Sequence, residues 1–91
     1  MTSPIRLSRD GSIAVILIEN PPVNALGHSV RSALIDALQE MKDPGVEAIV
    51  VGGAGGVFSG GADITEFGQT PRSPSLRDVI AAIEQIDRPT I

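Results

Sequence analysis

The sequence predicts an α/β fold whose elements follow the order β-β-α-β-loop-α. Two observations predict it. Aliphatic runs of strand length occur at residues 13–18 and 46–51, and the segment between them repeats apolar residues with the spacing of a helix face. A strand, a helix and a second strand in that order form a parallel βαβ unit, because the helix supplies the crossover that parallel neighbours require.

The first elements are two strands, at residues 5–7 and 12–19, joined by a turn at Asp10-Gly11. An Asp-Gly pair between β-prone runs is typical of a hairpin, since glycine adopts the positive φ of the turn at little cost. The run at residues 13–18 is apolar throughout, which we expect of a strand covered on both faces. The prolines at positions 21 and 22 end it, because proline donates no ladder hydrogen bond.

Two later segments have the periodicity of amphipathic helices. The apolar face of the first comprises Val30, Ala33, Leu34, Ala37, Leu38 and Met41, and Arg31 falls outside it. This helix ends near Asp43-Pro44-Gly45, a stop signal. The apolar face of the second comprises Leu76, Val79, Ile80, Ile83 and Ile86. Ser73-Pro74 offers this second helix a cap and a first-turn proline, and residues 88–91 look like the first step of another strand.

Composition narrows the classes of function. Eleven acidic and seven basic side chains give a net charge of −4, so a nucleic-acid partner is disfavoured. The absence of cysteine excludes disulfides, thiolate catalysis and cysteine-based zinc sites. No export signal is visible at Met1, and the longest apolar run is too short to insert into a membrane. We therefore expect a cytoplasmic protein without a bound metal.

A glycine-rich loop follows the strand at residues 46–51. It has six glycines in the ten residues from Gly52 to Gly61. A phosphate-binding reading fails, because neither a G-x-G-x-x-G register nor a Gly-Lys-Ser/Thr sequence is present. Gly60-Gly61 instead allows a sharp turn and a close approach to a ligand. The alternative is that these glycines only let a strand and a helix pack together.

The residues after this turn have the form of a helix start. In Asp63-Ile64-Thr65-Glu66, Asp63 is expected to cap the helix and Glu66 to reach back to the cap. Such a turn leaves backbone N–H groups unpaired, including that of Ala62, and these attract negative oxygen. If the oxygen develops charge during a reaction, this N–H forms one half of an oxyanion hole.

Two segments in register resemble the crotonase (enoyl-CoA hydratase/isomerase) superfamily. They are Asn20-Pro21-Pro22-Val23-Asn24-Ala25-Leu26 and Phe58-Ser59-Gly60-Gly61-Ala62-Asp63-Ile64-Thr65-Glu66-Phe67. The similarity extends from about Ile13 to the end and is greatest to the hydratase end of multifunctional fatty-acid β-oxidation enzymes. It implies that the chain is the N-terminal half of a crotonase-like ββα superhelix.

The resemblance also implies a site. The backbone N–H of Ala62 matches the first oxyanion donor to the thioester carbonyl of an acyl-CoA. The residues expected to line the path of the coenzyme A and the thioester are Val23, Ala25, Gly60, Gly61, Ala62, Asp63 and Ile64. Coenzyme A enters as part of the substrate, and no covalently bound cofactor is implied. Where relatives often have lysine, this chain has Thr65, which weakens any phosphate contact there.

The implied function is the acyl-CoA-binding part of an enoyl-CoA hydratase. Residues 1–91 are expected to be the N-terminal portion of one domain, stopping before the second oxyanion turn and before the catalytic glutamates, so the chain alone should be inactive or nearly so. Local carboxylates at Asp63 and Glu66 are expected to be structural, as is His28. Alternatives are another reaction of the superfamily, such as isomerase or thioesterase, or a non-catalytic acyl-CoA-binding or assembly module. A homo-oligomer is possible, since the family is often trimeric.

Overall fold

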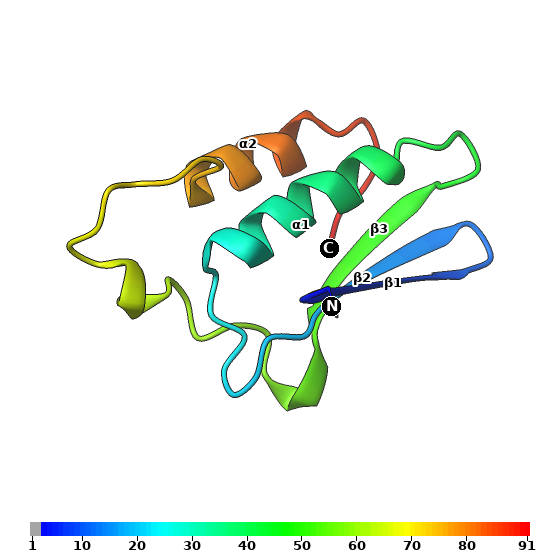
Figure 1. Cartoon of the computed structure of the whole chain (residues 1–91). Helices are drawn as coiled ribbons and strands as arrows, with labels where there is room; N and C mark the ends of the chain where they lie inside the picture. Colours follow the sequence, from blue (N-terminus) through cyan, green and yellow to red (C-terminus); the bar gives the residue numbers. More distant parts are fainter. Residues whose placement is uncertain (1–2) are drawn as a thin grey trace.

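The computed structural model describes residues 3–91. The elements in chain order are β1 (Ile5–Asp10), β2 (Ile13–Ile18), α1 (His28–Glu40), β3 (Ala48–Gly53), the 3-10 turns η1 (Ala54–Gly56) and η2 (Ile64–Glu66), and α2 (Leu76–Gln85). β1 pairs antiparallel with β2, and β2 pairs in parallel with β3, so the sheet order is β1-β2-β3. The predicted α/β class, hairpin and βαβ unit are confirmed (Figure 1).

The core lies between the sheet and α1. Ala14, Ile16 and Ile18 on β2 are fully buried, at 0–1% exposure. Both helices lie on the same side of the sheet (Figure 1). As a result Ile13 stays 40% exposed. The expectation that β2 is covered on both faces is therefore wrong for the part of the chain that the structure describes.

The first amphipathic helix forms as predicted, with one correction. The apolar face of α1 is buried, and its buried members are Val30, Leu34, Ala37 and Leu38. Arg31 was expected outside this buried face, yet only 7% of its surface is exposed. It is buried because loop residues fold over the first turn of α1 and accept hydrogen bonds from its guanidinium.

The second helix, α2, packs against α1 through Val79. Its start differs from the prediction: the cap is Ser75, not Ser73-Pro74. The Ser75 hydroxyl accepts a hydrogen bond from the N–H of Asp78 at 3.1 Å, and the Asp78 carboxylate accepts one from the N–H of Ser75 at 2.8 Å. This reciprocal pair satisfies two donors of the helix end. Ile80 is 49% exposed, so part of the apolar face of α2 is open.

The third strand starts two residues later than predicted and includes two glycines of the loop. A Cβ at Gly53 would lie 1.9 Å from the carbonyl oxygen of Val57, because the chain turns back directly onto the strand end. At the C-terminus, the N–H of Val51 donates to the carbonyl of Ile91 at 2.8 Å. The predicted start of a further strand therefore lies beside β3. Within residues 3–91, no helix is both long and apolar enough to cross a membrane.

Candidate functional site

Two loops at one end of the sheet are joined along their backbones. They are residues 20–27, between β2 and α1, and residues 54–62, after β3. The N–H of Gly60 donates to the carbonyl of Val23 at 2.6 Å, and the N–H of Leu26 donates to the carbonyl of Gly61 at 2.8 Å. Leu26 and Ala62 form a parallel β-bridge. The two segments that resemble the crotonase superfamily therefore lie side by side.

Asn24 connects both loops through a buried side chain, which is 3% exposed. Its Oδ1 accepts from the N–H of Asn20 at 2.8 Å, and its Nδ2 donates to the carbonyls of Ala54 at 3.1 Å and Val57 at 2.7 Å. Its φ of 54° lies in the left-handed region, which asparagine tolerates better than most residues. This role of Asn24 was not predicted from the sequence, although an asparagine between turn-forming residues is a known signal for this conformation.

The Gly60-Gly61 turn uses its two glycines for different purposes. Gly61 has a φ of 97°, which confirms the predicted sharp turn. A Cβ at Gly60 would lie 3.1 Å from Cβ of Val23, so the close approach here is to the neighbouring loop. The Ser59 hydroxyl donates to the carbonyl of Asn24 at 2.8 Å and accepts from the N–H of Gly61 at 2.9 Å. These contacts fix the Gly60–Gly61 peptide, two residues before the Asp63 cap and directly before the Gly61–Ala62 peptide.

Ala62 is exposed and lies at the head of η2. Its neighbour Gly61 supplies the carbonyl that bonds to Leu26, and the Ala62 N–H itself points away from that bridge. Among the hydrogen bonds of residues 3–91, none uses this N–H as a donor. This N–H, on an exposed residue, therefore has no hydrogen-bond acceptor in the part of the chain that the structure describes.

The turn after Ala62 is shorter than predicted, since η2 is a single 3-10 turn. Asp63 caps it as expected: its Oδ1 accepts from the Thr65 hydroxyl at 2.6 Å and from the Thr65 N–H at 2.9 Å. These two bonds, the hydroxyl first, lower the pKa of Asp63. The carboxylate consequently stays ionised and occupied at neutral pH.

Glu66 departs from its predicted role. It does not reach back to Asp63; its Oε2 accepts from the N–H of His28 at 2.7 Å and its Oε1 accepts from Nη1 of Arg31 at 3.0 Å. The first N–H groups of α1 have no partner within the helix, and they attract a carboxylate. The bond from His28 and then that from Arg31 lower the pKa of Glu66.

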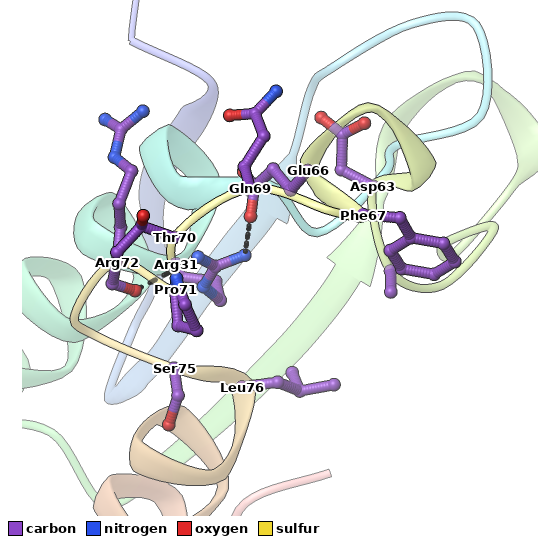
Figure 2. A pocket seen from close by; sticks show the side chains of 11 residues that line it. Arg31, Asp63, Glu66, Phe67, Gln69, Thr70, Pro71, Arg72, Ser75 and Leu76 are labelled. Carbon is purple, nitrogen blue, oxygen red and sulfur yellow. Dashed lines mark hydrogen bonds and ion pairs between the residues drawn. The ribbon is translucent and has the colours of Figure 1, made fainter.

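Arg31 is the centre of the polar contacts around the site. Its Nη1 also donates to the carbonyl of Leu26 at 2.7 Å, its Nε donates to that of Pro74 at 2.7 Å, and its Nη2 donates to that of Arg72 at 3.3 Å. Figure 2 shows the guanidinium enclosed between η2 and the loop that leads to α2. Sequence periodicity missed this residue, because it places Arg31 off the apolar face and says nothing of the loops above.

A pocket of about 230 Å³ lies beside this cluster. Its lining comprises Arg31, Ala62, Asp63, Glu66, Phe67, Gln69, Thr70, Pro71, Arg72, Ser75 and Leu76 (Figure 2). Of the predicted site residues, Ala62 and Asp63 thus line one pocket. Val23, Gly60 and Gly61 lie in the joined loops next to it, and Ile64 is 75% exposed outside its wall. Ala25 is half-buried and holds Asn20 through its carbonyl.

His28 is built into the same end of the molecule. Its Nε2 lies 2.9 Å from the carbonyl oxygen of Ser73, and its Nδ1 lies 2.9 Å from Nη2 of Arg72. Because arginine can only donate, Nδ1 is the acceptor of the bond from Arg72, and Nε2 can donate to the carbonyl of Ser73. Both contacts link α1 to the loop before α2, in keeping with the structural role expected for this histidine.

Comparison with known proteins identifies the family. The model of the family described as enoyl-CoA hydratase/isomerase matches residues 8–91. The peroxisomal bifunctional enzyme of Danio rerio is 43% identical over 81 residues, which are 88% of this chain and 11% of that protein. The glyoxysomal fatty acid beta-oxidation multifunctional protein MFP-a of Cucumis sativus is 48% identical over 87 residues, 90% of this chain and 12% of that protein.

A solved structure has the same fold. The enoyl-CoA hydratase/carnithine racemase from Magnetospirillum magneticum superposes with a TM-score of 0.84 at 25% identity, covering 99% of this chain and 38% of that one. This chain thus spans a minor part of the length of its relatives. Two of these relatives are multifunctional or bifunctional enzymes, which agrees with the predicted likeness. The chain belongs to the enoyl-CoA hydratase/isomerase family, the crotonase superfamily.

Proposed function

We propose that this chain supplies the acyl-CoA-binding part of an enoyl-CoA hydratase, and that the N–H of Ala62 donates to the thioester carbonyl oxygen. The proposal is supported by the N–H of Ala62, an exposed residue that lines a pocket: it has no hydrogen-bond acceptor among residues 3–91 and stands at the position where the family resemblance implies an oxyanion donor. The name of the relative from Cucumis sativus includes fatty acid beta-oxidation, and we propose the same process for this chain.

The amide is held in place before any ligand arrives. Gly61 sets the direction of the peptide, Ser59 binds the N–H of Gly61, and Leu26 binds the carbonyl of Gly61. A donor fixed in advance stabilises developing negative charge without a cost of reorganisation. Because η2 has only three residues, its dipole adds little, and the fixed N–H is the main contribution.

Such a donor suits hydration of a 2-enoyl thioester. Water adds its oxygen at C3 and a proton at C2, and the thioester oxygen becomes enolate-like between these events. Removing one oxyanion donor typically lowers kcat about 10²–10³-fold. The second donor and the two glutamates that the resemblance implies are assigned to no residue of this chain.

The substrate also fits an acidic chain. Coenzyme A is polyanionic, and the chain carries a net charge of −4, so recognition by many cations is disfavoured. We propose that backbone groups of the two joined loops, including those of Val23, Ala25, Gly60 and Gly61, contact the coenzyme A. Asp63 and Ile64 border the thioester end.

Binding without turnover is a second candidate, and the local carboxylates favour it. Asp63 accepts from Thr65, and Glu66 accepts from His28 and Arg31, so both are engaged. Both have lowered pKa values, which makes them weak bases and poor proton donors at neutral pH. Because both carboxylates are engaged and ionised, the second candidate for this chain is binding of an acyl-CoA without turnover.

The amide of Ala62 provides the test. A 2-enoyl-CoA is titrated into the 15N-labelled chain, and hydration is followed by loss of the enoyl-thioester absorbance. We expect saturable binding with a large downfield shift of the Ala62 amide proton. Ala62→Pro removes the donor, whereas Ala62→Ser keeps it. In a preparation that hydrates the substrate, Ala62→Pro should lower kcat about 100-fold or more.

The controls separate the donor from the turn. Circular dichroism must show that Ala62→Pro is folded, and Ala62→Ser must keep the binding shift. Binding with no change in absorbance supports the second candidate. The donor role is wrong if the folded Ala62→Pro variant turns over normally, or if saturating ligand leaves the Ala62 amide unshifted.

A further inference from the structure

We propose that Arg31 is a positioning residue that holds the Ala62 amide from both sides and joins it to the opposite wall of the pocket. The catalytic effect of Arg31 rests on the proposed function. The set of hydrogen bonds that Arg31 makes to three segments, which we call the clamp, is present in the ligand-free chain. The observation is one buried guanidinium with four partners on three separate segments.

The first arm of the clamp is a bond from Arg31 to Leu26, which in turn binds Gly61, the residue before Ala62. Nη1 of Arg31 donates to the carbonyl of Leu26 at 2.7 Å. The N–H of the same Leu26 donates to the carbonyl of Gly61 at 2.8 Å. The orientation of the Gly61 carbonyl also fixes the Ala62 N–H, because both belong to one planar peptide. Arg31 therefore acts on this amide through a single intervening residue.

The second arm reaches the turn after Ala62. Nη1 of Arg31 also donates to Oε1 of Glu66 at 3.0 Å, and the other oxygen of Glu66 accepts from the N–H of His28 at 2.7 Å. These bonds attach the end of η2 to the first turn of α1. Because η2 is one 3-10 turn, it has little rigidity of its own, and its place depends on this attachment.

The third arm reaches the far wall of the pocket. Nε of Arg31 donates to the carbonyl of Pro74 at 2.7 Å, and Nη2 donates to that of Arg72 at 3.3 Å. Residues 69–72 and Ser75 line the same pocket as Ala62. One side chain thus sets the separation between the donor and the wall, as Figure 2 shows for Arg31 between Glu66 and Arg72.

Only arginine meets these demands. Its planar guanidinium presents five N–H donors in a fixed fork, whereas lysine offers one compact ammonium on a flexible stem. Lysine at position 31 would keep the charge and could pair with Glu66, but it could not also reach Leu26 and the residue 72–74 carbonyls. Arg31→Lys therefore tests geometry at constant charge.

Arg88 provides the matched control at the other end of α1. Its Nη1 donates to the carbonyls of Met41 at 2.6 Å and Asp43 at 2.8 Å, so it too is an arginine bound to backbone oxygens. Neither Arg88 nor the residues that its guanidinium binds line the pocket. Arg88→Lys should therefore cost stability in the same manner without affecting the Ala62 amide.

The experiment measures 15N relaxation on the ligand-free chain. In Arg31→Lys, the order parameter of the Ala62 amide should fall from about 0.85 toward 0.6, the range of flexible backbone. In Arg88→Lys it should stay unchanged. Should Arg31→Lys fail to fold, Glu66→Gln removes part of the second arm only and should give a smaller fall. An unchanged order parameter at Ala62 in the folded variants overturns the clamp.

The catalytic consequence is measured separately. In a preparation that hydrates a 2-enoyl-CoA, Arg31→Lys should lower kcat about 100-fold with little change in KM, because a misplacement of about 1 Å costs roughly that much. A rise in KM alone would contradict the positioning role. If the native chain shows no ligand shift at Ala62, the proposed function fails, while the ligand-free relaxation still decides the clamp.

Discussion

The sheet with its covering helix and the loops around the pocket are held together by different forces. Between the sheet and α1, buried aliphatic side chains such as Ile16 and Val30 belong to one hydrophobic core. In the pocket loops, defined as residues 20–27 and 54–75, single polar side chains bind several backbone groups each. Among residues 3–91, the buried examples are Asn24, in the first of these loops, and Arg31, which reaches them from the first turn of α1.

This difference determines how each region responds to change. Apolar burial is non-directional and roughly proportional to area, so the core loses stability by degrees as atoms are removed. A polar side chain that holds several carbonyls acts through direction, and its removal leaves buried acceptors without partners. We therefore expect core substitutions to lower the stability of the whole chain, and loop substitutions to displace the site at a smaller cost.

Ile16→Ala is the largest expected effect. Ile16 is fully buried between β2 and α1, so truncation leaves a cavity as well as losing apolar contact. Such changes cost about 2–5 kcal/mol of unfolding free energy. Urea denaturation followed by circular dichroism measures the loss.

The control for Ile16→Ala is Ile80→Ala on α2. Ile80 is 49% exposed, so the same truncation should cost much less. Equal losses at the two positions would mean that the core between the sheet and α1 does not dominate the stability of the chain.

Asn24→Ala should have an intermediate effect on stability and a large one on the site. It leaves the N–H of Asn20 and the carbonyls of Ala54 and Val57 without their partner, at a cost of about 1–3 kcal/mol. Residues 54–62 should then move away from residues 20–27. Amide chemical shifts should change at Gly60 and Ala62, far more than in the strands.

Asn24→Gly separates the two roles of this asparagine. Glycine adopts the positive φ of this position freely but makes none of the side-chain bonds. If the hydrogen bonds hold the loops together, Asn24→Gly should shift the same amides as Asn24→Ala. A wild-type spectrum for the glycine variant would assign the whole effect to backbone conformation.

The same contrast explains what the sequence could predict. α1 and α2 were predicted from periodicity, because the burial of one face repeats along a helix, and β2 was predicted from its unbroken apolar run. Gly61 followed from the conformational demand of a turn. The bonds of Arg31 to Pro74 and Glu66, and of Glu66 to His28, could not be predicted, because each joins residues more than thirty positions apart. The D-x-x-E spacing predicted that Glu66 would bind back to Asp63, but its carboxylate binds the N–H of His28 in the first turn of α1 instead.

The smallest expected effect is the pH dependence that Glu66 adds to stability. Its bonds from His28 and Arg31 lower its pKa in the folded chain, so between that value and the ordinary value of about 4.3 the unfolded state binds more protons. The stabilisation is complete above pH 4.3 and is lost as pH falls through the lowered pKa. Glu66→Gln should therefore flatten the fall of unfolding free energy below about pH 4.3. Glu40→Gln makes the same change of formal charge at an exposed helix position, and it serves as the control for this slope. Identical slopes for the native chain and Glu66→Gln would show that the bonds to α1 do not depend on the charge of Glu66.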